Sequence, residues 1–250
     1  MFRVGRIPYL NCEPFFAHLS GFPTLDLPPR QLGEALARGE ADAAALSLAD
    51  FLRLEPSLEG LPFGIATDGP ARSVILFSDR ALAELEGATI SVTDETATSV
   101  EILRVLLALR YRVTPRAWVG PSVDADAVLL IGDRAIRALT GPSRFRHAVD
   151  LGREWVEWTG LPCVFARWGV RRAAAAADRL AFARALDSAL VRGLESLPEI
   201  AERRRDTGWG PAEITTYLRG FTYRIGPREE RAIAEFQRLH DEVLRVLRPA

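Results

Sequence analysis

The chain has 250 residues, a formal charge of -1 and an apolar fraction of 48%, which predicts a globular protein of one large domain or two small ones. The near-neutral charge gives no general attraction to nucleic acid or an anionic membrane, and no apolar run is long enough to span a bilayer. Phe2 and Arg3 lead directly into a strand without the apolar stretch of a signal peptide, so we expect a cytoplasmic protein without nucleic-acid or membrane partners.

Strand and helix signals alternate through the first part of the chain. A first strand leads into the loop at 8–12, and a helix is expected from there through Leu19. Asn11 has the side chain of a helix N-cap, and Pro14 is tolerated only in a first turn. The elements expected next are a helix over 31–38 that ends at Gly39, a strand over 41–46, a helix from Ser47 to Leu52, strands over 72–78 and 88–92, a helix over 98–109, a strand over 128–131, a helix to Leu139 and a strand over 163–170.

From Asp178 onward the pattern is almost entirely helical, and the last helix spaces its apolar residues helically from Ile233 to Leu247. This layout predicts an α/β fold with two lobes. Lobe I would contain 1–84 and 168–250, including the C-terminal helices, and lobe II would contain 85–167. Two chain crossings without a flexible linker predict a hinged ligand cleft between the lobes, as in type II periplasmic binding proteins.

Polar residues follow the predicted strands at four strand-to-helix switches, where ligands of open α/β sheets bind. The candidates are Asn11, Ser47, Thr96, Thr98, Ser99, Gly132 and Asp133, and Ser73 in a predicted hinge strand adds another hydroxyl. The hydroxyls at 96–99 would combine with N–H groups at a helix N-terminus to form a cradle for a carboxylate or phosphate. At position 132 the missing Cβ would let a ligand approach the backbone.

Each candidate also has an ordinary structural explanation, as an N-cap or as the glycine of a tight turn, and taken singly that explanation is favoured. Glu13 is expected to face solvent and favour a helix dipole, and Arg72 to be a solvated surface arginine rather than an anion clamp. Several polar caps at successive switch points in both lobes nevertheless favour a binding site.

Composition narrows the chemistry of such a site. All 32 basic residues are arginine, which excludes a Schiff-base lysine, a pyridoxal-phosphate anchor and a complete phosphate-binding P-loop. Cys12 and Cys163 are too few for a disulfide framework or a zinc site, and the three histidines have no metal or triad spacing. We therefore expect no metal and no cofactor, with anions bound by arginine, hydroxyl groups or backbone N–H groups.

Five segments carry a resemblance to a known family: RIPYLNCEPF, LARGEADAAALS, SDRALAELEGATISVTDETATSV, VLLIGDRAI and DLGREWVEWTGLPCVFARWGVR, in this order. Together they resemble the menaquinone-biosynthesis family of the futalosine route, in its chorismate dehydratase branch. The resemblance covers most of the chain and is weakest in the C-terminal helices. It implies a type II periplasmic-binding-protein fold used as a cytoplasmic enzyme, a lyase without a cofactor.

The sister branch of this family, a dihydroxynaphthoate synthase, shares the fold and carries a catalytic histidine after the apolar strand of the second lobe. Here that place reads Ile131-Gly132-Asp133, so the chain resembles the dehydratase. Two positions depart from the dehydratase pattern, because Glu13 stands where an apolar residue is usual and Arg72 where glycine is common.

The resemblance implies loss of water from chorismate, a dicarboxylate, to give 3-[(1-carboxyvinyl)oxy]benzoate. We expect Thr96, Thr98 and Ser99 to bind one carboxylate. Asn11, Ser47 and Ser73 would hold the other carboxylate or the leaving hydroxyl, with Asn11 orienting the substrate rather than acting as base. The proton acceptor is the substrate's enolpyruvyl carboxylate, Asp133 or Glu13.

Two other classes of protein compete with this interpretation. A solute receptor of this fold would capture a small organic anion without chemistry, but such receptors are normally exported. The effector domain of a regulator is disfavoured because the chain has neither a helix-turn-helix segment nor a basic surface run.

Overall fold

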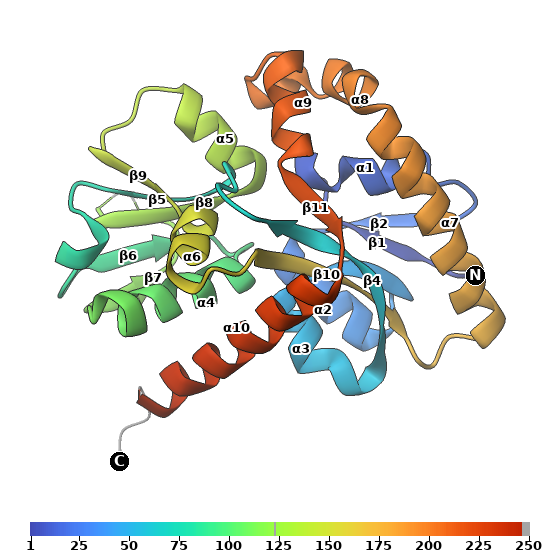
Figure 1. Cartoon of the computed structure of the whole chain (residues 1–250), viewed down its shortest axis with the longest axis horizontal. Helices are drawn as coiled ribbons and strands as arrows, with labels where there is room; N and C mark the ends of the chain where they lie inside the picture. Colours follow the sequence, from blue (N-terminus) through green and yellow to red (C-terminus); the bar gives the residue numbers. More distant parts are fainter. Residues whose placement is uncertain (123, 247–250) are drawn as a thin grey trace. The chain divides into compact units, whose positions relative to one another are not determined.

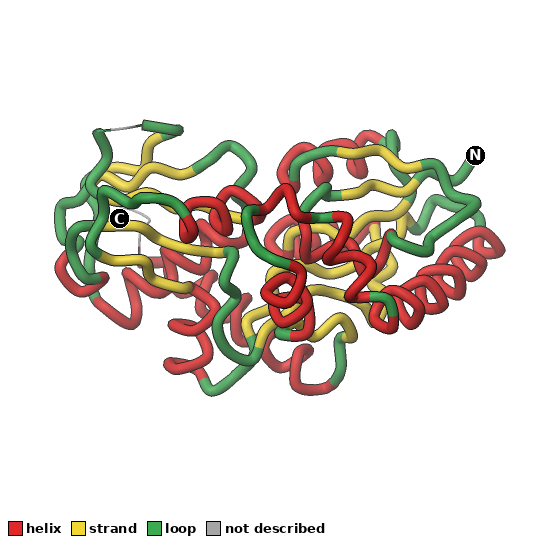
Figure 2. The backbone as a smooth tube through the Cα atoms, turned by 90° about the horizontal axis from the view of Figure 1, so that it is seen from above, coloured by secondary structure: helices red, strands yellow, loops and turns green. Residues whose placement is uncertain are grey.

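The computed structural model describes residues 1–122 and 124–246. The chain folds into two compact units: unit 1 comprises Met1–Ile65 and Phe165–Ile225, and unit 2 comprises Ala66–Val164 and the chain from Gly226 onward. In each unit the strands form a sheet and the helices pack beside it, as the yellow and red segments of Figure 2 show. Among the described helices, none combines the length and apolar character needed to cross a bilayer.

Unit 1 is built on a sheet with the strand order β11-β4-β10-β3-β1-β2 (Figure 1). These strands are β1 (Val4–Arg6), β2 (Thr24–Asp26), β3 (Ala43–Ser47), β4 (Leu58–Thr67), β10 (Cys163–Arg171) and β11 (Phe221–Arg224). β1 runs parallel to β2 and β3, whereas β10 is antiparallel to β3. The helical segments are η1 (Leu10–Cys12), α1 (Glu13–Phe16), α2 (Pro29–Arg38), α3 (Leu48–Leu54), η2 (Glu55–Ser57), α7 (Ala176–Glu195), α8 (Leu197–Arg203), η5 (Arg205–Thr207) and α9 (Pro211–Arg219).

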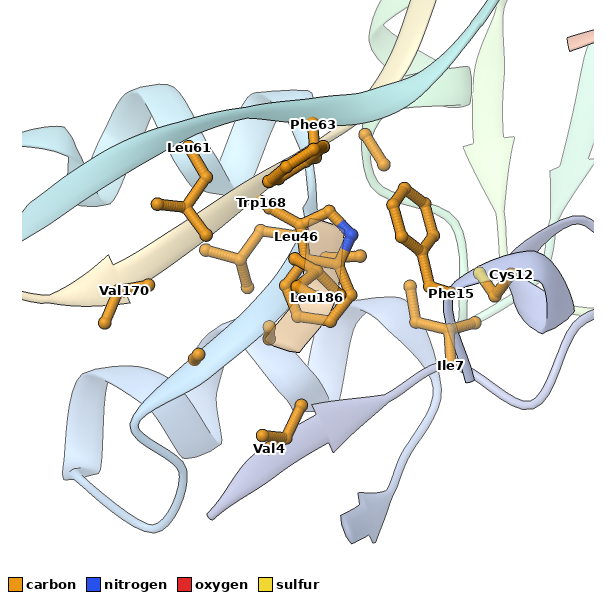
Figure 3. Close-up of a cluster of buried hydrophobic side chains, with 14 of the residues drawn as sticks. Val4, Ile7, Cys12, Phe15, Leu46, Leu61, Phe63, Trp168, Val170 and Leu186 are labelled. Carbon is orange, nitrogen blue, oxygen red and sulfur yellow. The ribbon is translucent and has the colours of Figure 1, made fainter. Parts of the chain in front are cut away.

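The core of unit 1 fixes the segment that follows β1. Phe15 of α1 is fully buried and packs edge-on against Trp168 of β10, with 5.4 Å between the ring centroids (Figure 3). α7 lies directly against α1, since a Cβ at Gly193 would stand 1.9 Å from the carbonyl oxygen of Pro14. The short helical segment after β1 is therefore clamped between the sheet and α7.

Unit 2 is built on a sheet with the strand order β7-β6-β8-β5-β9. Its strands are β5 (Val74–Ser78), β6 (Thr89–Val92), β7 (Ala117–Val119), β8 (Ala127–Ile131) and β9 (His147–Asp150). β6 is parallel to β7 and β8, and β5 is antiparallel to β8 and β9. The helical segments are η3 (Leu82–Glu84), α4 (Thr98–Val105), the π-helical η4 (Leu106–Tyr111), α5 (Gly132–Thr140), α6 (Leu151–Thr159) and α10 (Pro227–Val246).

Most of the elements expected from the sequence are present within a few residues of their expected limits. α2 ends at Gly39, whose φ of 76° is the left-handed conformation that favours glycine. The first helix is shorter than expected, because α1 ends at Phe16 rather than continuing to Leu19. β2, β4, β7 and β11 were not expected, and all but β4 are strands of three or four residues.

The division of the chain differs from the expected lobes of 1–84 with 168–250 and 85–167. Residues 66–84 belong to unit 2, because β5 lies inside its sheet between β8 and β9. The last helix also belongs to unit 2, where Phe236 packs on Trp155 and His240 contacts Glu101 of α4 at 3.2 Å. All C-terminal helices were expected to pack on the first lobe; in the structure α7–α9 lie in unit 1 and α10 lies in unit 2.

The chain passes between the units three times, at 65/66, 164/165 and 225/226, instead of the expected two. The third passage takes the chain from β11 of unit 1 into α10. Residue Leu247 of the expected apolar pattern, and the end of the expected lobe I at 247–250, lie outside the described residues.

Candidate functional site

The expected site residues of unit 2 meet at one edge of its sheet. β6 and β8 are parallel, so the loop from Thr93 to Ser99 and the start of α5 both follow strand ends at this edge. β5 is antiparallel to β8, with Val74 opposite Ile131, which brings Ser73 to the same place. The Gly132 N–H donates a hydrogen bond of 2.8 Å to the Ser73 carbonyl oxygen and ties these segments together.

The hydroxyl-rich loop is buried at the start of α4. Thr96, Thr98 and Ser99 are 5%, 3% and 7% exposed, and the hydroxyls of Thr93 and Thr96 lie 2.8 Å apart. The N-cap of α4 is Ala97, which makes no side-chain cap, so the ordinary explanation of Thr98 or Ser99 as the N-cap is wrong. The first-turn N–H groups of an α-helix have no acceptor within the helix, and here the same segment carries the hydroxyls of Thr96, Thr98 and Ser99. This combination suits an anion.

Gly132 and Asp133 begin α5 at the same edge. The φ of Gly132 is 58°, so the tight turn after β8 needs the left-handed conformation that glycine adopts without strain. Asp133 follows in the first turn of the helix and is 7% exposed. A buried carboxylate at this edge would repel an anionic ligand, unless a cation is also present or the carboxylate is protonated.

Asp150 organises the edge, and sequence reasoning did not single it out. Its Oδ1 accepts hydrogen bonds from the N–H groups of Ala71, Gly152 and Arg153 at 2.9, 2.9 and 3.1 Å. Its Oδ2 accepts the Arg72 N–H at 2.6 Å. One side chain thus caps α6 and holds the segment that carries Ser73. The signal in the sequence was the Asp-Leu-Gly at 150–152, in which the aspartate precedes a helix as an N-cap does.

The two expected site residues of unit 1 also share a sheet edge, because β1 and β3 are parallel and end side by side. Asn11 lies inside η1 rather than at a helix N-cap, since Tyr9 precedes η1 and Cys12 precedes α1. The expectation of an N-cap is therefore wrong, because η1 continues directly into α1 and Asn11 lies within the first of these two helical segments. The Asn11 Oδ1 accepts a weak hydrogen bond from the Cys12 thiol, with 3.6 Å between sulfur and oxygen.

Ser47 is the N-cap of α3, which is the ordinary structural explanation given for it above. The Ser47 Oγ accepts the Asp50 N–H at 3.1 Å and donates to the Asp50 Oδ2 at 2.9 Å. The hydroxyl is therefore oriented by α3, and any ligand at this edge would meet an oxygen whose proton already points to Asp50.

Glu13 is not the solvated residue that the sequence suggested. Its Oε1 accepts from Arg6 at 3.0 Å and from Arg204 at 2.5 Å, and its side chain is 13% exposed. Two guanidinium groups thus hold this carboxylate in ion pairs, so Glu13 is a poor candidate for the base. Its role is to join β1, α1 and the segment after α8.

Thiols and histidines add little chemistry to these edges. Burial raises the pKa of the Cys163 thiol well above its usual range, with Asp150 adding to the effect. His18 contacts the Ser196 hydroxyl and His240 contacts the Glu101 carboxylate of α4. Across the described part of the chain, no group of three or more histidine, cysteine or acidic side chains is placed to hold a metal ion.

The arrangement of two sheets defines a protein with the periplasmic-binding-protein fold. The structure matches that of a protein from Archaeoglobus fulgidus with a TM-score of 0.78 over 96% of both chains, at 17% identity. It matches the periplasmic aliphatic sulphonate binding protein SsuA from Escherichia coli with a TM-score of 0.68, over 98% of this chain and 86% of the other, at 15% identity. At these identities the likeness establishes the fold alone.

Sequence comparison is more specific. A family model described as menaquinone biosynthesis matches residues 2–242. The chain is 34% identical over 251 residues to the chorismate dehydratase of Thermus thermophilus, covering 89% of each protein. It is 27% identical over 178 residues to the chorismate dehydratase of Campylobacter jejuni, covering 66% of this chain and 65% of that protein. The chain belongs to the menaquinone biosynthesis family.

Proposed function

We propose that the protein is a chorismate dehydratase, a lyase that removes water from chorismate. The similarity to the Thermus thermophilus enzyme supports this, because it extends over 89% of both chains. The observation that carries the choice within the family is the turn after β8, where Gly132 and Asp133 stand in place of the histidine of the sister dihydroxynaphthoate synthase.

The reaction breaks the bond from the ring carbon to its hydroxyl oxygen and the C–H bond at the ether-bearing carbon. A new ring double bond makes the product aromatic, which drives the reaction downhill. The protein must therefore hold a dianion, stabilise the departing hydroxyl and leave the C–H bond facing a proton acceptor. These tasks suit hydroxyls, amides and N–H groups.

We assign Thr96, Thr98 and Ser99, with the N–H groups that begin α4, to one carboxylate of the substrate. Ser73 and the backbone at Gly132 line the same edge. We assign Asn11 and Ser47 of unit 1 to the other carboxylate or to the leaving hydroxyl. Asn11 is the only asparagine of the chain.

The proton acceptor in this proposal is the substrate's own enolpyruvyl carboxylate. A neutral amide cannot accept the proton usefully, and Glu13 is held by Arg6 and Arg204. Asp133 is the competing protein base. If Asp133→Asn abolished turnover while chorismate still bound, the substrate-assisted version would be contradicted.

The primary test is to incubate the purified protein with chorismate and to follow 3-[(1-carboxyvinyl)oxy]benzoate by chromatography with mass detection. Product formation is expected, and Asn11→Ala should lower kcat by about 10²–10³-fold, because an oriented amide at a developing charge contributes that much. Saturable binding of chorismate without product would support a solute receptor instead. Unchanged turnover in Asn11→Ala would remove Asn11 from the scheme.

A further inference from the structure

Arg72 has a backbone conformation that is unfavourable for its residue type. Its φ is 58°, and among the described residues only Arg112, with a φ of 55°, is another non-glycine residue at positive φ. A Cβ in the left-handed region is crowded by its own carbonyl, so such residues persist only where surrounding structure holds them. Here the Arg72 N–H is held by Asp150 at 2.6 Å.

The position of Arg72 links this strain to the site. It immediately precedes the buried Ser73, whose carbonyl oxygen accepts the Gly132 N–H, and its own side chain is exposed. Arg72 therefore lies at the edge of the unit 2 sheet where the hydroxyl-rich loop and Asp133 also lie. Arg134 and Arg153 begin helices near this edge, but their helical backbone carries no such penalty.

The charge of the site gives a reason for an arginine at position 72 in spite of the strain. The residues assigned to the substrate are an asparagine, serines, threonines, a glycine and an aspartate, a set without a positive side chain. A substrate with two carboxylates brings two negative charges toward Asp133. In a chain without lysine the compensating cation must be an arginine. A guanidinium also matches the planar geometry of a carboxylate and can bind both of its oxygens.

We propose that Arg72 is a specificity-determining residue that binds a carboxylate of the dianionic substrate. The inference rests on the proposed function, which supplies the dianion. A glycine would fit this backbone without strain. The arginine therefore lowers the free energy of unfolding locally but places a positive charge at the site. The expected consequence is separation of the two effects: removing Arg72 should weaken substrate binding without weakening the fold.

The test compares Arg72→Gly with Arg112→Gly, since both remove an exposed arginine from the same strained conformation. Arg112 follows η4 and lies next to Val113, which is bonded to Leu107, so it is remote from the loops that carry the site. Each variant is assayed for chorismate turnover, for the dissociation constant of the non-reacting product, and for its urea unfolding midpoint. Arg72→Lys, which keeps the charge, and Arg72→Asn, which tolerates the left-handed region, complete the set.

Both glycine variants should unfold at the same or a higher urea concentration than the natural protein. Only Arg72→Gly should weaken chorismate and product binding, by about tenfold to a hundredfold, the range of a charge-assisted hydrogen bond. Arg72→Asn should behave likewise and Arg72→Lys should recover part of the loss. Binding by the natural protein should also fall more steeply with salt than binding by Arg72→Gly.

Equal product affinity in Arg72→Gly and the natural protein would overturn the assignment, as would an equal loss in Arg112→Gly. An unchanged salt dependence in Arg72→Gly would overturn it as well, because a purely structural role removes no charge from the complex. The proposed function fails separately: a natural protein that binds the product but does not turn over chorismate contradicts the dehydratase and leaves the role of Arg72 standing. A natural protein that binds neither dicarboxylate overturns both.

Discussion

The carboxylate of Asp150 shows how one side chain can organise a sheet edge. It accepts four backbone N–H groups, two from the start of α6 and two from the segment that leads into β5. Such charge-assisted bonds are stronger than neutral ones, which is how the segment keeps Arg72 at a φ of 58°. The position of Ser73 depends on this network, although Asp150 is not itself assigned to the substrate.

The close packing beside Asp150 leads to a prediction for Gly152. A Cβ at this position would stand 2.9 Å from the Thr67 Cγ2 and 3.0 Å from the Ala71 Cβ and N. Gly152→Ala should therefore lower the free energy of unfolding by about 1–2 kcal/mol, overpacking being partly offset by the better helix propensity of alanine. Urea unfolding followed by tryptophan fluorescence measures this.

Gly69→Ala is the matched control, because a Cβ there would meet no atom within 4 Å. Its free energy of unfolding should stay within about 0.5 kcal/mol of the natural protein. Equal stability of the two variants would show that the segment before β5 can move away from α6, and the account of a rigid edge would be wrong.

At the scale of elements, the contact between α10 and α4 decides where the last helix belongs. His240 of α10 lies 3.2 Å from the Glu101 carboxylate of α4, and Phe236 stacks on the same imidazole with 5.8 Å between ring centroids. The hydrogen bond to Glu101 raises the pKa of His240, more than its partial burial lowers it. When His240 is protonated, it therefore forms an ion pair with Glu101 that ties the two helices together.

This pair should make stability depend on pH in a defined direction. The pKa of His240 is raised on folding, so its contribution is complete below the unfolded value of about 6.5 and is lost as the pH rises through the higher folded value. Glu101→Gln should therefore lower the free energy of unfolding by about 0.5–1 kcal/mol at pH 5.5 and by almost nothing at pH 9. Urea unfolding at the two pH values measures the difference.

Glu242→Gln serves as the control on the same helix, because its partner Arg238, at 3.1 Å, stays charged at both pH values. Its effect should be small and equal at pH 5.5 and pH 9. A Glu101→Gln effect that is also independent of pH would mean that His240 does not titrate against Glu101.

At the scale of the whole molecule, the chain forms two units and passes between them three times. The third passage places α10 in unit 2. Phe236→Ala should remove the packing of α10 on Trp155, where the ring centroids lie 6.1 Å apart, at a cost of about 3–5 kcal/mol. Hydrogen exchange measured by mass spectrometry should then accelerate in α10, α4 and α6 and change little in α7, α8 and α9.

Phe182→Ala is the corresponding change in the core of unit 1, where Phe182 is fully buried against Trp168. Exchange should accelerate in α7 and the unit 1 sheet and remain slow in α10. The reverse pattern, with α10 responding to Phe182→Ala, would place the last helix with unit 1 after all.

The sequence predicted the fold class and most long elements because these follow from local patterns. A few neighbouring residues are enough to predict each of three features: the buried strand β3, the end of α2 at Gly39 and the helical spacing of α10. The short strands β2, β7 and β11 were missed, since three or four residues carry too little periodicity. β4 was missed although it is long, because Gly60, Pro62 and Gly64 interrupt its pattern.

The candidate site divides in the same way. Its residue types and their places after strands were predictable, and the pairing of β8 with β6 (parallel) and with β5 (antiparallel) brings Ser73, Thr98 and Gly132 to one edge. Asn11 and Glu13 were misjudged locally, because a helix cap and a solvated carboxylate are the usual outcomes for such residues in isolation. Contacts with Arg204, 191 positions away, changed the outcome for Glu13.

Sequence alone determined that this is a two-sheet α/β protein of the menaquinone biosynthesis family, with hydroxyl and amide groups at its strand ends and no lysine to bind anions. Only the tertiary structure decided that α10 joins unit 2, that Asp150 holds the edge of its sheet and that Arg72 is strained there. The physical reason is range: periodicity and capping act over a few residues, whereas these features depend on hydrogen bonds and packing between segments distant in the chain.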